Sequence, residues 1–166
     1  MLKMSQVLRV VSLAILFGGS AMIVFAAITL VKAAEADGVT VSEAAARNAP
    51  LFINYSKVAL ATACVLLFSE FTDAYLNKTK TVLMKARYVS SAICFAAMII
   101  FGLVLVPPLA ELQPKMKTDP AAHEEFKKFH ETSRGVFGIA ILSALVSLVL
   151  PVLESAAEAK LETKAS

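Results

Sequence analysis

Three long runs of this 166-residue chain contain no charged residue, and they constrain its fold more than any other feature. They cover residues 10–31, 88–110 and 135–153. A helix of about 20 apolar residues, rising about 1.5 Å per residue, crosses the hydrocarbon core of a bilayer. Each run meets that length, so the sequence predicts an integral membrane protein.

The first run ends near Ala34-Glu35-Ala36, which resembles the cleavage site of a signal peptide. The apolar region of a signal peptide is usually only about 7–15 residues long, and this run is longer. We therefore expect it to be retained as a transmembrane helix.

A fourth apolar segment, at 50–71, contains Asn54, Lys57 and Glu70 inside a predicted span. If Lys57 marked the outer boundary, the uncharged residues after it would be too few to cross a bilayer. We therefore expect the span to begin near Pro50, with Lys57 about 10 Å inside it.

The polar residues of this segment fall on two helical faces. Asn54 and Lys57 share a stripe with Ala61 and Cys64, because their spacing follows the helical repeat. Two arrangements lower the cost of this stripe: it faces the inside of the bundle, or Lys57 extends to the nearer headgroups. Glu70 lies on the opposite side, about 20 Å further along the axis, so it cannot pair with Lys57 within one helix.

The composition leaves little material for a soluble domain, because 58% of the residues are hydrophobic and the mean hydropathy is +0.72. A net charge of +3 is too small to indicate binding of nucleic acid. We predict one domain over 1–166, an all-α integral membrane four-helix bundle with an amphipathic helix before the last span. The predicted spans are 8–31, 50–71, 87–106 and 135–153, and the amphipathic segment is 119–134.

Proline and capping residues mark the ends of the predicted helices. Thr40 or Ser42 can cap a short helix over 43–47, and Pro50 then suits the first turn of the second span. Pro107 and Pro108 lack backbone donors, so the third span should stop or kink near 104–106.

The segment 119–134 has the pattern of an amphipathic helix that begins with Asp119 as its cap. One face carries Phe126, Phe129 and Ser133, and His130 lies on a charged face. The helix either lies at the membrane interface or projects as an extension of the last span.

Small residues on two spans predict helix-packing faces, because they let backbones approach closely in lipid. These residues are Ala14, Gly18 and Ala21 in the first span and Gly135, Gly138, Ala140, Ser143, Ala144 and Ser147 in the last.

Two further residue types have expected places. Both cysteines, Cys64 and Cys94, lie in apolar segments and should be small buried residues. Tyr55, Tyr75 and Tyr88 lie near span ends, where phenol rings favour the membrane interface.

The chain shows no arrangement of catalytic or metal-binding residues. His123 and His130 are the only histidines, and their spacing separates them by about 10.5 Å along a helix. One metal ion needs ligands on adjacent turns, so these two cannot chelate it, and Asp119 with His123 would form only a weak two-ligand site. No nucleophile–base pair, Gly-rich phosphate loop or buried histidine pair for haem is visible. We therefore expect no enzyme activity, no metal site and no cofactor.

The residues 126–133 read Phe-Lys-Lys-Phe-His-Glu-Thr-Ser, with Phe126, Phe129, His130 and Ser133 at the spacing Phe-x-x-hydrophobic-His-x-x-Ser. This signature resembles that of the transmembrane-protein-205-like domain family, small four-helix membrane proteins named as a domain of unknown function. Phe129 stands where family members often have leucine. The resemblance extends to the Gly18-Gly19 pair and to the end of the third span with Val106, Pro107 and Pro114. It implies four membrane-spanning helices and no established reaction.

The leading functional hypothesis is a non-catalytic, small multi-pass membrane protein that binds or supports other membrane components. Its expected surroundings are the lipid bilayer and other membrane protein subunits or further copies of the chain. The alternative is a small oligomeric transporter or permeation pathway along the polar face of the second span. The basic residues of the short loop at 72–87 favour both termini in the cytoplasm.

The last hypothesis concerns His130 and Ser133. We expect them to fix the amphipathic segment onto the connector between the first two spans, where Glu35, Asp37 and Glu43 are available as acidic partners.

Overall fold

The computed structural model describes residues 2–77, 81–116 and 118–165. In these parts of the chain every regular element is a helix, and no strand is present. Four of the helices are long and apolar enough to cross a membrane. The predicted all-α four-helix fold is therefore confirmed.

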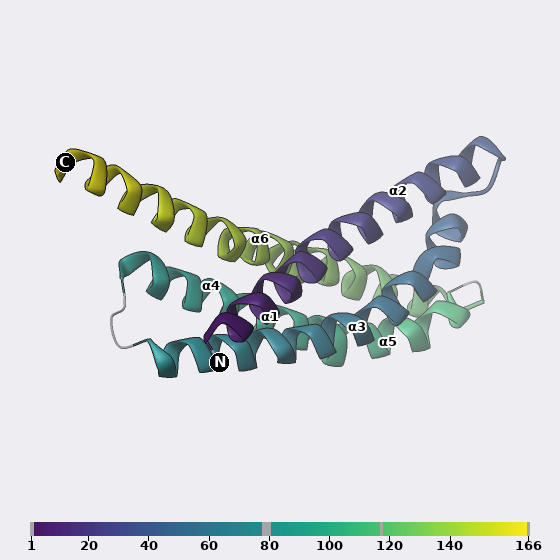
Figure 1. The fold of residues 1–166 in the computed structure, drawn as a ribbon. Coiled ribbons are helices and arrows are strands. Elements are labelled where there is room, and N and C mark those ends of the chain that lie inside the picture. Colours follow the sequence, from purple (N-terminus) through teal and green to yellow (C-terminus); the bar gives the residue numbers. More distant parts are fainter. Residues whose placement is uncertain (1, 78–80, 117, 166) are drawn as a thin grey trace.

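The four spans follow one another along the chain (Figure 1). The first span is formed by α1 (Leu2–Ala14), the π-helix η1 (Ile15–Gly19) and α2 (Ser20–Ala36). The second is α3 (Val41–Leu76). The third is formed by α4 (Val82–Ile99), the π-helix η2 (Ile100–Leu105) and α5 (Val106–Leu112), and the short 3₁₀-helix η3 (Gln113–Lys115) follows it. The fourth is α6 (Pro120–Ala165).

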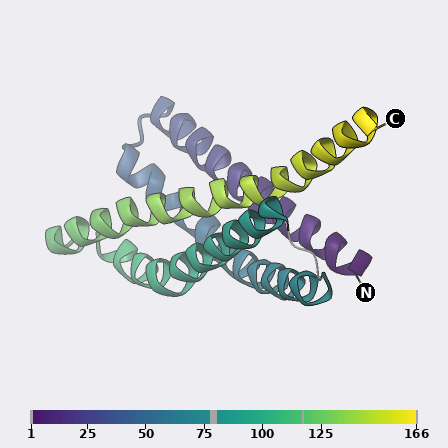
Figure 2. The same ribbon diagram turned by 90° about the vertical axis from the view of Figure 1, so that its left-hand side faces the viewer.

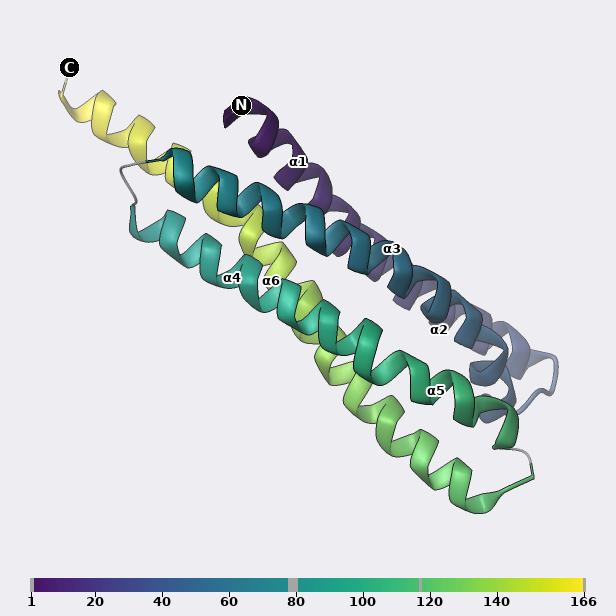
Figure 3. The ribbon, with the colours of Figure 1, turned by 90° about the horizontal axis from the view of Figure 1, so that it is seen from below.

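The described chain ends lie at one end of the bundle, together with the last turn of α3 and the first turn of α4 (Figure 3). We call this the terminal end. The opposite end contains the α2–α3 connector and the start of α6, and we call it the connector end. Seen from a second side, α6 crosses the first span at an angle, with η1 at the crossing (Figure 2).

The helices extend beyond the predicted spans, because the residues that cap them lie outside the apolar runs. Thr40 accepts a hydrogen bond from the Glu43 amide at 3.3 Å, so α3 begins far before Pro50. Asp119 accepts one from the Ala121 amide at 2.9 Å and so caps α6. The amphipathic segment is thus a continuous extension of the fourth span, one of the two arrangements expected for it.

Pro50 lies inside α3 and not in its first turn as the sequence predicted. A proline in a helix has no N–H for the carbonyl four residues earlier, which here belongs to Ala46. The Gln113 side chain from η3 donates a hydrogen bond to that carbonyl. A side chain from the third span therefore compensates for the missing backbone donor, and the helix continues.

The third span continues through Pro107 and Pro108, where the sequence predicted a stop or a kink. The residues just before the two prolines form the π-helix η2. A π-helix widens the turn, which gives room where proline rings would otherwise clash with the preceding carbonyls. The prolines thus alter the helix type and do not end the helix before Leu112.

Phe137 of α6 is the centre of an aromatic cluster that joins three spans. Its ring centroid lies 4.6 Å from that of Phe101 and 6.2 Å from those of Phe52 and Tyr55. Small core residues surround this cluster and allow the helices to pack closely. At Gly102, an added Cβ would lie 2.7 Å from the Leu60 side chain, so a larger residue there would require that side chain to shift.

Tyr55, whose ring was predicted to lie at the membrane interface, is half-buried and connects α3 to the first span. Its hydroxyl donates to the Ile15 carbonyl at 3.0 Å and lies 2.9 Å from the Ser20 hydroxyl. The ring approaches Gly19 so closely that an added Cβ would lie 3.0 Å from it. Tyr55 therefore binds η1 through its hydroxyl group. Its ring packs against Gly19, whereas Gly18 has no such neighbour.

The small residues that the sequence predicted as packing faces fall into two groups. Ala140, Ala144 and Ser147 of the fourth span are buried inside the bundle. A Cβ added at Gly18, Gly135 or Gly138 would meet nothing within 4 Å, and Ala14 and Ala21 are exposed. At two other positions, Gly19 and Gly102, an added Cβ would press on a neighbouring side chain. Spacing alone did not distinguish these cases, because it does not show which face of a helix meets its neighbours.

Candidate functional site

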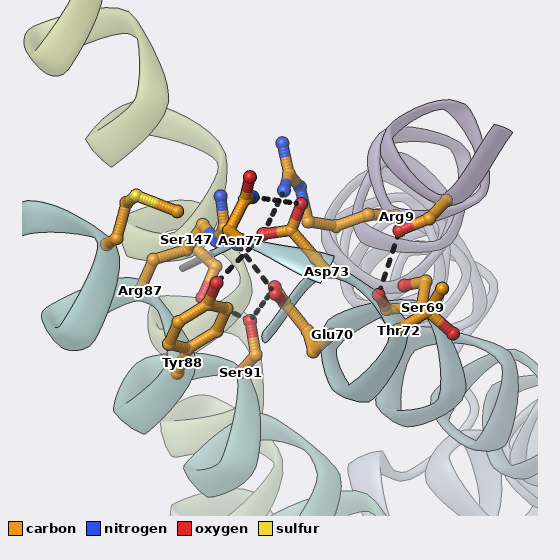
Figure 4. Close-up of polar contacts among 12 residues, drawn as sticks. Arg9, Ser69, Glu70, Thr72, Asp73, Asn77, Arg87, Tyr88, Ser91 and Ser147 are labelled. Atoms are coloured by element: carbon orange, nitrogen blue, oxygen red, sulfur yellow. Dashed lines mark hydrogen bonds and ion pairs between the residues drawn. The ribbon is translucent and has the colours of Figure 1, made fainter. Parts of the chain in front are cut away.

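Four charged side chains from three helices meet inside the bundle near its terminal end (Figure 4). They are Arg9 of α1, Glu70 and Asp73 of α3, and Arg87 of α4. All four are buried, with relative exposures between 1% for Asp73 and 6% for Arg9. We call this group the charge cluster.

Arg87 is the cation shared by the two acidic residues. Its Nη2 atom lies 3.0 Å from Glu70 Oε2 and also bonds Asp73 Oδ2. Arg9 approaches the same Asp73 oxygen from α1, with Nη1 at 3.6 Å. The two cations and two anions balance, which is the arrangement that buried charges need in a medium of low dielectric constant.

Neutral side chains complete the hydrogen bonds of the two carboxylates. Tyr88 donates its hydroxyl to Asp73 at 2.9 Å, and Asn77 donates its amide to the other Asp73 oxygen at 3.0 Å. Ser91 donates to Glu70 at 2.8 Å, and its oxygen lies 3.1 Å from the hydroxyl of Ser147 on α6. The hydrogen bonds therefore connect α3, α4 and α6, and the Arg9 ion pair joins the first span to them.

Helical spacing positions these side chains. Glu70 and Asp73 are three residues apart and share one face of α3, and Arg87 and Ser91 are four apart and share one face of α4. Ser5 supports the same contact between helices, because its hydroxyl donates to the Ser69 carbonyl at 3.0 Å. Arg9 reaches the cluster through its ion pair with Asp73, and its Nε and Nη1 atoms have no hydrogen-bond partner among the described residues.

The sequence analysis found only one member of this cluster, Glu70. Arg9 and Arg87 looked like boundary charges beside uncharged runs, and Asp73 looked like a loop residue. Tyr88 was expected at the membrane interface, but it binds Asp73 and its ring lies 4.7 Å from the Arg87 guanidinium carbon. The signal in the sequence was the pair of acidic residues three apart next to an arginine and serine four apart.

The structure separates Glu70 from the other two polar residues predicted within the second span. Asn54 and Lys57 are exposed on the outer surface of α3, together with Ala61 and Cys64. Of the two arrangements expected for this stripe, the one that faces the inside of the bundle is wrong, because Ala59, Ala63 and Leu66 occupy the inner face. Cys64 is correspondingly exposed, and only Cys94 is buried as predicted.

The motif residues of α6 lie at the connector end. His130 is exposed, and its ring stacks on Phe126 with centroids 5.8 Å apart. Ser133 is buried and donates to the His130 carbonyl at 2.8 Å. The charged neighbours of His130 are Glu131 and Arg134 on its own helix, and not the predicted Glu35 or Asp37.

Two open grooves lie at the connector end, far from the charge cluster. One is lined by Leu105 of η2 and by Phe129 and Thr132 of α6. The other lies between α3 and η3, next to Pro50 and Gln113. Neither groove includes a residue of the cluster.

No group of three or more His, Cys, Asp or Glu residues suited to a metal ion occurs in the described residues. Comparisons with known protein families, with curated proteins and with solved structures yield no match to this chain. The resemblance to the transmembrane-protein-205-like domain family therefore remains a hypothesis.

Proposed function

We propose that this protein is a non-catalytic, multi-pass membrane protein that binds or supports other membrane components, as a subunit or accessory of a larger assembly. The observation that carries the proposal is a contrast between the inside and the outside of the bundle. Inside, the charged groups bind one another. Outside, the faces suited to close helix contact have no neighbour.

The internal half of this contrast supports a structural role for the reactive side chains. Glu70 and Asp73 are buried carboxylates that could act as general acids or bases, and each is engaged with other members of the cluster. A catalytic site also needs space for a substrate beside such groups. The grooves described above lie at the other end of the bundle.

The external half of the contrast supports docking. Gly18, Gly135 and Gly138 would each accept a side chain without a clash, so nothing within this chain requires glycine there. In lipid, helices associate chiefly through close packing and hydrogen bonds, and small residues favour that approach. The outer faces of the first and fourth spans are therefore the proposed docking surfaces.

The test is native mass spectrometry and crosslinking of the protein extracted from its own membrane in mild detergent. We expect complexes with another membrane protein, and we expect Gly18→Leu or Gly138→Leu to reduce them without changing helix content. Ala92→Leu is the matched control, because it adds the same bulk on an exposed part of α4. A strictly monomeric particle without protein or lipid partners would contradict the proposal.

The second candidate remains a small oligomeric permeation pathway along α3. Its support is that Asn54 and Lys57 lie on one outward face, so that several copies are needed to enclose a polar path. Flux through reconstituted liposomes that is abolished by Lys57→Leu would favour this candidate over the first.

A further inference from the structure

The outer face of α3 carries a polar stripe that no described residue of this chain satisfies. Asn54 and Lys57 are exposed, and neither forms a hydrogen bond or ion pair with another described residue. Val58, Val65 and Phe68 are exposed around them. The stripe is therefore a polar site on an otherwise apolar surface.

The register of the neighbouring helices places this stripe within the membrane. Tyr55 lies against Ser20, and Asn48 donates to the Ala27 carbonyl, so α3 and the first span run antiparallel. Because the helices are antiparallel, moving two residues on from Tyr55 to Lys57 corresponds to moving two residues back from Ser20 to Gly18. Gly18 is near the middle of the uncharged run 10–31. Unsatisfied polar groups at such depth are costly, because no water is present to hydrate them.

The third span gives a shallower position for the same residue. Gly102 lies against Leu60, so Lys57 is level with the end of η2, several residues before Glu111. Even by this register Lys57 lies about 9 Å from the nearest charged residue of the third span. Both neighbouring helices therefore place the backbone of Lys57 inside the apolar layer.

The charge of the stripe identifies the chemistry of its occupant. A buried ammonium group needs a carboxylate, and an asparagine amide provides hydrogen bonds across a helix interface. Ala61 is small and lies one turn further along the same face, where it permits close backbone contact. We propose that the face of α3 formed by Asn54, Lys57, Ala61 and Cys64 docks a transmembrane helix of a different protein, which carries an Asp or Glu at the depth of Lys57.

A second copy of this chain fits the face poorly. A symmetric contact across it would place two Lys57 side chains together, and like charges repel strongly where water is absent. The two carboxylates within the bundle, Glu70 and Asp73, are buried and engaged by Arg87. The carboxylate must therefore come from another protein.

The two cysteines provide the experiment, which uses the full chain in its own membrane. Cys64 lies on the proposed face and is exposed. Cys94 is buried, so a labelling reagent cannot reach it in the folded bundle. A benzophenone maleimide is attached to Cys64 in the Cys94→Ala variant and activated by light. We expect one defined protein adduct whose crosslinked peptide is a transmembrane segment containing Asp or Glu.

Charge variants make the test specific. Lys57→Arg keeps the charge and should keep the adduct, whereas Lys57→Leu and Lys57→Glu should reduce it at least tenfold with unchanged helix content. Adducts with lipid alone, or with a second copy of this chain, would overturn the inference, as would equal protein adducts in all variants.

This inference rests on the proposed function, and the two fail separately. Native mass spectrometry that finds partners bound through other faces, without a Cys64 adduct, would overturn only the α3 docking face. A monomer without any partner would overturn both.

Discussion

At the scale of single residues, Asp73 is the most connected side chain in the bundle. Its carboxylate accepts hydrogen bonds from Arg87, Tyr88 and Asn77, and it forms an ion pair with Arg9. These contacts connect α1, α3 and α4 at one level. Without this anion the two buried cations would share Glu70 alone, so its removal should affect the whole fold.

Replacement of Asp73 by alanine should lower the free energy of unfolding by about 3–5 kcal/mol, because it leaves the two arginines with Glu70 as their only anion. The measurement is denaturant unfolding in detergent micelles, followed by circular dichroism. Asp37→Ala, at an exposed residue of the α2–α3 connector, is the matched control and should change little. Equal stability of the two variants would show that the cluster contributes nothing to the fold.

The charge cluster also shows what the sequence did and did not reveal about single residues. Glu70 was recognised because it lies inside an apolar segment. Asp73 and Arg87 lie on either side of a short connection between spans, where charges are common and usually solvated. Their burial depends on the tight packing of α3 against α4, and Arg9 reaches them from a helix distant in the sequence. Tertiary contacts of this kind are not encoded in local spacing.

At the scale of elements, the apolar runs predicted the four helices, and the predicted caps at Thr40 and Asp119 are confirmed as the starts of α3 and α6. The sequence did not show that the capped segments continue into the spans, nor the π-helical turns. The prolines were expected to begin or end helices. Contacts from other elements overcome that local preference, as the Gln113 side chain does at the Ala46 carbonyl.

This compensation at Pro50 gives a prediction for α3. Gln113→Ala should leave the Ala46 carbonyl without a donor and cost about 1–3 kcal/mol of stability. In a Pro50→Ala background the new backbone N–H can satisfy that carbonyl, so the same change should cost much less. A double-mutant cycle on the unfolding free energy measures the difference. Additive effects of the two substitutions would show that Gln113 does not compensate for the proline.

At the scale of the whole molecule, the four spans are buried to very different degrees. In the most apolar stretch of the third span, 50% of the residues are buried. In the corresponding stretch of the first span, only 11% are buried. The third span is therefore the centre of the bundle, and the first span presents most of its surface to its surroundings. This asymmetry agrees with the proposed docking of other membrane components on the outside of the bundle.

The orientation of the molecule gives the last prediction. Four spans place both chain ends at the terminal end (Figure 3), and positive charge near short loops favours the cytoplasmic side. Arg9 and Arg87 are engaged with carboxylates in the cluster, so the lysines of the α3–α4 connection and Lys3 remain to set the orientation. We propose that the terminal end faces the cytoplasm.

A fluorescent protein fused to the C-terminus should then fluoresce, and alkaline phosphatase fused there should be inactive. Phosphatase inserted at Gly38, in the α2–α3 connector, should be active because that turn lies on the other side. The reverse pattern would show that the density of lysines does not set the orientation of this chain.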